Sequence, residues 1–151
     1  MDDNALPILY NGIIYYSIEI NDISSLEDVN VDFPVDIIKE NKCIQNSCYC
    51  AENIGCDCVE GVVVAILNRS FHVFCHCWNI KGNQDFDITK EIILDSKEPN
   101  TNYIYFPFSR HLYTEYEAKY GKNKDDYGYI NDGIYEFQKT INSFMESQVK
   151  K

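Results

Sequence analysis

Three stretches rich in β-branched and aromatic residues predict strands. Segment 8–20 reads ILYNGIIYYSIEI, and its Asn-Gly pair predicts two short strands around a tight turn. Segment 61–78 reads GVVVAILNRSFHVFCHCW, and its Asn-Arg-Ser sequence predicts the turn of a central hairpin. Segment 103–108 predicts a third strand region, at the edge of a sheet because it contains Pro107.

The last part of the chain has the periodicity of a helix. From residue 134 onward, apolar residues recur every three or four positions, which places them on one helical face. They are Ile134, Phe137, Ile141, Phe144, Met145 and Val149. We therefore expect an amphipathic C-terminal helix over 134–149 with its apolar side in the core. Upstream, segment 88–94 fits either a strand or a short helix.

Segment 43–58 shows no periodic apolar pattern, yet it holds five of the seven cysteines. Such a segment keeps a fixed structure only if metal ions or disulfides hold it. The patterns together predict a small β-rich α+β fold with a metal-stabilised cysteine-rich loop region and a C-terminal helix. A length of 151 residues fits a single domain over 1–151.

The charge balance changes the range of expected partners. Acidic residues outnumber basic ones by 24 to 13, which gives a net charge of −11 and opposes direct binding of nucleic acid. Residues 1–36 carry eight acidic side chains and no Lys or Arg. This acidic N-terminal region is either a solvated surface or a docking surface for a basic protein partner.

The sequence shows no sign of membrane insertion or export. No apolar run approaches the length of a membrane span, and the chain opens with Asp2 and Asp3 instead of a basic signal sequence. We therefore expect an intracellular protein without a membrane partner.

The cysteines are the strongest chemical signal. Three Cys-x-Cys pairs occur, and a seventh cysteine precedes them. One intervening residue departs from the usual zinc-finger spacing and suits a cluster in which thiolates bridge two or three zinc ions. The predicted structural zinc ligands are Cys48, Cys50, Cys56, Cys58, Cys75 and Cys77, with Cys43 as a further candidate. Free buried thiols and disulfides are the alternatives.

A short cysteine motif resembles a known family. Residues 55–61 read GCDCVEG, which resembles a segment of the pre-SET domain of SET-type histone lysine methyltransferases, and Cys75 and Cys77 match a later Cys-x-Cys pair. The resemblance implies a zinc cluster and a nuclear, chromatin-associated role. The chain departs from the family in that no cysteine follows Cys77 and no SET-domain motif is present. It therefore implies no methyltransferase activity of its own.

These observations predict a non-enzymatic, zinc-binding structural or interaction module. A redox or metal-buffering thiol protein and a small disulfide-bonded protein are alternatives. A third alternative is an enzyme in which Cys75 or Cys77 is the nucleophile and a histidine is the base. The candidate bases are His72, His76 and His111. On the zinc hypothesis, Cys56→Ser should cost metal and fold together, whereas Cys43→Ser should be milder.

Overall fold

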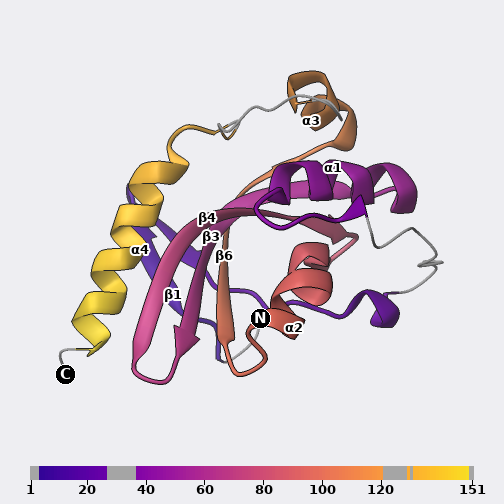
Figure 1. Ribbon diagram of the computed structural model, residues 1–151. Coiled ribbons are helices and arrows are strands. Elements are labelled where there is room, and N and C mark those ends of the chain that lie inside the picture. The colour runs from indigo at the N-terminus through magenta and orange to yellow at the C-terminus, as the bar shows by residue number, and fades with distance from the viewer. Residues whose placement is uncertain (1–3, 27–36, 121–128, 130, 150–151) are drawn as a thin grey trace.

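The computed structural model describes residues 4–26, 37–120, 129 and 131–149. Its strands and helices confirm the predicted α+β class (Figure 1). In chain order they are β1 (Pro7–Tyr10), β2 (Ile13–Tyr16), η1 (Ile23–Ser25), α1 (Cys43–Ile54), β3 (Asp57–Leu67), β4 (Ser70–Lys81), β5 (Gln84–Phe86), η3 (Lys90–Leu94), α2 (Asp95–Lys97), β6 (Asn102–His111), α3 (Tyr113–Tyr120) and α4 (Ile134–Val149). Part of the predicted acidic region, 27–36, lies outside the described residues.

The predicted central hairpin is confirmed as β3 and β4. These strands pair antiparallel from Asp57 opposite Ile80 to Leu67 opposite Ser70, and Asn68 turns the chain with a φ of 58°. They form the middle of a four-stranded antiparallel sheet in the order β5-β4-β3-β6. Pro107 lies on β6, an edge strand as predicted, where a missing backbone donor is tolerated.

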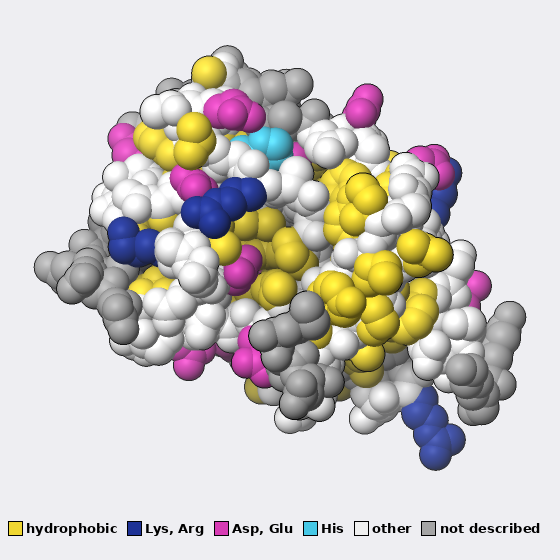
Figure 2. Space-filling view, turned by 180° about the vertical axis from the view of Figure 1, so that it is seen from behind, with side chains coloured by type: hydrophobic (Ala, Val, Ile, Leu, Met, Phe, Trp, Pro, Cys, Tyr) yellow, Lys and Arg dark blue, Asp and Glu magenta, His cyan; other side chains and the backbone are white. Residues whose placement is uncertain are grey.

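The predicted N-terminal pair of strands is also confirmed. β1 and β2 pair antiparallel around Asn11 and Gly12, whose φ values of 51° and 76° fit a tight hairpin turn. This hairpin exposes the apolar side chains of Leu9, Ile13 and Ile14. Hydrophobic side chains gather on the face of the molecule drawn in Figure 2.

The prediction of an irregular loop over 43–58 was wrong, because most of this segment is α1. Its buried side chains include Ile44, Ser47, Cys48 and Ala51, which recur at helical spacing. Small polar and thiol side chains form this buried stripe, so a search for large apolar residues misses it. α1 ends at Gly55, whose φ of 76° suits a helix C-terminus.

The two ends of the sheet are covered by different helices. α4 forms as predicted and buries Ile134, Phe137 and Ile141 against a core that includes Val62 of β3. α1 packs across the other end (Figure 1). Segment 88–94 is helical, as one of the two alternatives predicted, and ends in η3. Among the described residues, no helix is long and apolar enough to cross a membrane.

Replacing Gly61 with alanine tests the close packing of β3. A Cβ atom at this position would lie 2.3 Å from a ring carbon of Trp78 and 2.5 Å from the backbone oxygen of Phe106. Because both neighbours are fully buried, we expect Gly61→Ala to lower the free energy of unfolding by about 3 kcal/mol in urea denaturation. Gly133→Ala is the control, because its closest contact is a side-chain oxygen of Asn131 at 3.1 Å. Equal losses in both variants would contradict the packing argument.

Candidate active site

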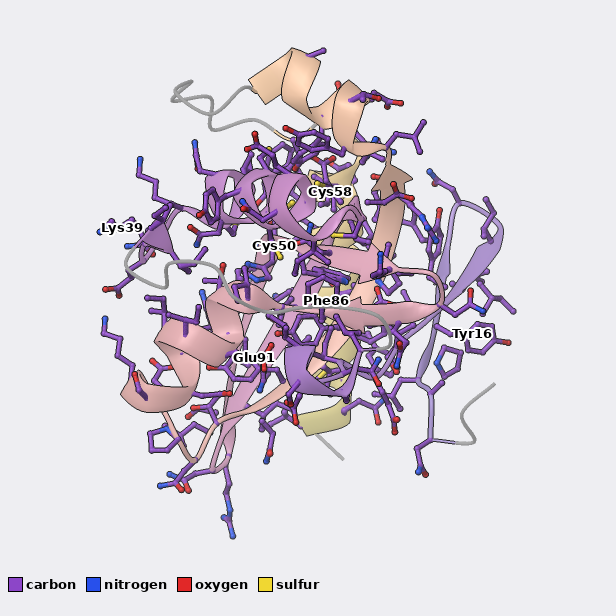
Figure 3. The ribbon with its side chains drawn as sticks, turned by 90° about the vertical axis from the view of Figure 1, so that its right-hand side faces the viewer. Tyr16, Lys39, Cys50, Cys58, Phe86 and Glu91 are labelled. Carbon is purple, nitrogen blue, oxygen red and sulfur yellow. The ribbon has the colours of Figure 1, made fainter. Side chains whose placement is uncertain are left out.

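The seven cysteines are distributed over α1, β3 and β4, and all of them are free thiols. Two pairs of thiols, Cys50 with Cys56 and Cys48 with Cys58, link α1 to the start of β3. A hydrogen bond with Cys56 and burial raise the pKa of Cys50, and a hydrogen bond with Cys48 and burial raise the pKa of Cys58. Figure 3 shows Cys50 and Phe86 between α1 and the helical segment that carries Glu91.

The structure does not support the predicted zinc cluster. Within the described part of the chain, no three His, Cys, Asp or Glu side chains are grouped so that they could hold a metal ion. The thiols of Cys75 and Cys77 also have separate partners. The Cys75 sulfur lies 3.3 Å from Oε1 of Gln138, and the Cys77 sulfur lies 3.0 Å from the hydroxyl of Tyr116. Zinc binding by these cysteines stays a prediction from the sequence.

Cys43 has surroundings that differ from those of the other thiols. It is the first residue of α1, where the helix dipole favours a negative charge. Burial alone would raise its pKa, but a hydrogen bond with His76 and the charge of that imidazole outweigh burial and lower the pKa. The backbone N–H of Cys77 and the hydroxyl of Tyr129, 3.9 Å from the sulfur, add to this effect. The site therefore favours a Cys43 thiolate.

His76 connects Cys43 to a buried carboxylate. Its Nε2 lies 2.7 Å from Oδ2 of Asp87, which leaves Nδ1 as the ring nitrogen that can face Cys43. Burial favours the neutral imidazole, but the charge and hydrogen bond of Asp87, together with Cys43, raise the pKa of His76 to about 10. The arrangement therefore favours an imidazolium next to the thiolate.

Asp87 is held by donors on both oxygens. Oδ2 also accepts a hydrogen bond of 2.7 Å from the Tyr105 hydroxyl, and Oδ1 accepts from the backbone N–H groups of Thr89 and Lys90 at 3.2 and 3.4 Å. Burial would raise the pKa of Asp87, but the charge of His76 and these hydrogen bonds lower it. The carboxylate is thus ionised and fixed in orientation.

Local sequence explains why these three residues meet. β5 pairs with β4 for three residues, and Asp87 follows β5 directly, so it returns to the level of His76. The buried Asn46 of α1 then connects the helix to this segment. Its amide nitrogen donates to the backbone oxygen of Lys39 at 2.8 Å and to the hydroxyl of Thr89 at 2.9 Å. Asn46 therefore fixes the start of α1, and with it Cys43, relative to Asp87.

A pocket of about 720 Å³ opens beside Cys43 and His76. Seven of its fifteen other lining residues are apolar or aromatic, and two acidic residues, Glu40 and Glu98, also line it. The apolar and aromatic lining residues are Ala65, Leu67, Phe71, Phe74, Ile93, Leu94 and Tyr103. A reactive thiol at the wall of such a pocket could meet a bound molecule.

Sequence reasoning found part of this site and misassigned the rest. It named His76 as a possible base, but for Cys75 or Cys77, whereas the structure pairs it with Cys43. His72 lies on the pocket wall, and His111 is buried 2.8 Å from Ser109 on β6. Asp87 was missed because it sits in a polar stretch. The available signal was an acidic residue soon after a strand that carries a histidine.

Asp87→Asn tests whether the carboxylate controls Cys43. Loss of its charge should lower the pKa of His76 and raise that of Cys43, because the imidazolium beside the thiolate is destabilised. We expect alkylation of Cys43 by iodoacetamide at pH 7 to slow roughly tenfold, and its pH profile to move to higher pH. The rate is measured by mass spectrometry of the peptide that contains Cys43.

Asp85→Asn is the matched control, because this neighbouring carboxylate accepts from Nε1 of Trp78 at 2.9 Å and makes no described contact with His76. Its alkylation profile should stay close to that of the unmodified sequence. Identical profiles for Asp87→Asn and the unmodified sequence would refute control of Cys43 by the carboxylate.

Comparison with known protein families, curated proteins and solved structures finds no match to this chain. The resemblance to pre-SET domains therefore stays a prediction from short motifs.

Proposed function

We propose that the protein is a cysteine-dependent acyl-transfer enzyme, a hydrolase or an acyltransferase. Cys43 is the nucleophile, His76 is the general acid and base, and Asp87 orients His76 and stabilises its charge. The observation that carries the proposal is the 2.7 Å contact between His76 and Asp87 at the wall of a pocket that Cys43 also lines, and His76 lowers the pKa of this thiol. It differs from the non-enzymatic module expected from the sequence.

The arrangement of Cys43, His76 and Asp87 supports a reaction in two steps, acylation of Cys43 and then release of the acyl group. The Cys43 thiolate attacks the carbonyl carbon of an ester, thioester or amide and forms a C–S bond. His76 donates its Nδ1 proton to the leaving oxygen, sulfur or nitrogen as the bond to that atom breaks. The neutral His76 then removes a proton from water or an amine that attacks the thioester, and the C–S bond breaks. The thiolate and imidazolium are thereby restored.

The positions of Asp87 and Tyr105 support the role given to Asp87. In this type of site, a buried carboxylate holds the imidazole in one orientation and one tautomer and stabilises the imidazolium. Here the carboxylate oxygen that meets His76 is also bound by Tyr105, so its direction is fixed. His76 and Cys43 both line the pocket, so the imidazole remains next to it.

The other hypotheses have less support from the described residues. The redox or metal-buffering hypothesis predicts several exposed, reactive thiols, but five of the seven cysteines are buried and the other two are half-buried. Burial raises the pKa of the half-buried Cys75 to about 11. Cys43 is the described thiol with a lowered pKa, which favours one reactive position over a general thiol function.

Cys43→Ala tests the assignment of the nucleophile. With p-nitrophenyl acetate, acylation of Cys43 should release a burst of about one p-nitrophenolate per protein molecule, and Cys43→Ala should lose it. His76→Gln should slow the burst about 100-fold, because the imidazole no longer takes part in proton transfer. Stopped-flow absorbance measures the burst, and the mass of the acylated peptide identifies the modified residue.

Cys56→Ser is the matched control, because Cys56 lies at the junction of α1 and β3, outside the pocket lining. This variant should keep its burst and its fold. The zinc hypothesis predicts the reverse order, with metal and fold lost in Cys56→Ser and a milder effect at Cys43. A full burst in Cys43→Ala would exclude Cys43 as the nucleophile.

A further inference from the structure

β4 has an edge without a strand partner that leads to Cys43. β3 pairs with β4 from Ser70 to Ile80, whereas β5 pairs with the other edge of β4 only from Asn79 to Lys81. From Ser70 to Trp78, that second edge has no strand partner among the described residues. Such an edge presents backbone N–H and C=O groups that can pair with another chain.

Three contacts show which backbone groups of β4 face this edge. Asn79 pairs with β5, the N–H of Cys77 bonds to the Cys43 sulfur, and the carbonyl of Val73 accepts from Nε2 of Gln138 at 3.1 Å. Backbone groups of successive residues alternate between the two edges of an antiparallel strand. The groups of Phe71, Val73 and Cys75 therefore point away from β3, in a row that ends at the nucleophile.

The pocket lies over the face of the sheet that borders this edge, because its lining includes residues of β3 and β6 as well as of β4. β4 contributes Ser70, Phe71, His72, Phe74, Cys75 and His76 to the lining, and Cys43 also lines the pocket. Ile93 and Leu94, which belong to η3, line it as well. An apolar side chain of a bound molecule can therefore be buried while its backbone lies along β4.

The charges of the pocket restrict the ligand further. Glu40 and Glu98 line it, and no Lys or Arg is among its described lining residues. Glu40 is paired with Lys97, and Glu98 accepts from the hydroxyl of Tyr103 at 3.3 Å. Because Lys97 compensates the charge of Glu40, Glu98 is the carboxylate that disfavours an anionic ligand and favours a basic one.

We propose that the acyl donor is an extended polypeptide segment that adds to the β4 edge as a further strand, with an apolar side chain in the pocket and a basic one near Glu98. The inference rests on the proposed function of Cys43 and names its substrate class. Backbone pairing supplies affinity, and alternate side chains supply specificity. At Val73 the incoming N–H replaces the amide of Gln138, so one donor is exchanged for another.

A scan of covalent peptide probes tests the strand pairing. The probe is acetyl-Leu-Lys-Leu-Phe acyloxymethyl ketone, in which the Cys43 sulfur displaces the carboxylate from the methylene carbon. Each amide nitrogen is methylated in turn. Because every second amide of a strand faces its neighbour, labelling of Cys43 should slow at least tenfold for alternate positions and change little for the others. Intact mass and peptide mapping measure the labelling rate.

Two reference probes separate this inference from the proposed function. One is an aliphatic acyloxymethyl ketone without amides, and the other is iodoacetamide. Rapid labelling of Cys43 by the aliphatic probe, with no alternation in the methylation scan, would overturn the peptide inference and leave the nucleophile intact. If no probe labels Cys43 faster than it labels unfolded protein, the proposed function fails, and the peptide inference fails with it.

Two substitutions at Cys75 provide a test on the protein side. Cys75→Pro removes an N–H that faces the open edge and leaves the bonds between β3 and β4 in place. Cys75→Ala removes the same thiol but keeps the N–H. The peptide probe should label Cys75→Pro at least tenfold more slowly than Cys75→Ala, while iodoacetamide labels Cys43 equally in both. Equal peptide labelling in two folded variants would contradict pairing at this edge.

Discussion

The buried contact between His76 and Asp87 is the interaction on which the candidate site depends. It joins β4 to the start of the helical segment after β5, and the same carboxylate also binds Tyr105 of β6. Two opposite charges inside a protein are stable only when each has close partners. Removal of one partner leaves an unpaired buried charge and costs about 3–5 kcal/mol. The contact therefore has consequences for both stability and the state of Cys43.

The rest of the fold places a thiol next to this pair. α1 begins at Cys43, and Asn46, one turn further on, binds both Lys39 and Thr89. The helix start is thereby fastened to the segment that carries Asp87. Because β4 is unpaired beyond β5, His76 and Cys43 lie at the end of an open strand edge and beside a pocket. The lowered pKa of Cys43 and the access of a ligand to this thiol thus both depend on β4.

Local sequence patterns predicted the helices and strands whose formation depends on residues close together in the sequence. The two hairpins have clear turn residues, and α4 has large apolar residues at helical spacing, so both were predicted correctly. α1 was missed because Ser47, Cys48 and Ala51 are small, and only the surface they meet shows that they form a buried stripe. The Cys-x-Cys pairs favoured a metal site in the sequence analysis, whereas the thiol with the lowered pKa is Cys43, which lies outside these pairs.

The site could not be derived from spacing along the chain. Cys43 and His76 lie on different elements, and their meeting depends on how α1 crosses the sheet. Asp87 comes close to His76 because β5 is short and the chain turns back immediately after it. Each residue alone has an ordinary structural interpretation, and the chemistry follows from their contacts.

The most direct test of the account is the protonation state of His76, measured by nitrogen-15 NMR of protein labelled at histidine. His76→Gln identifies the signals by their loss. Because Asp87 and Cys43 raise the pKa of His76 to about 10, both ring nitrogens should carry protons at pH 8. A neutral His76 ring at pH 8 would contradict the thiolate–imidazolium pair on which the account rests.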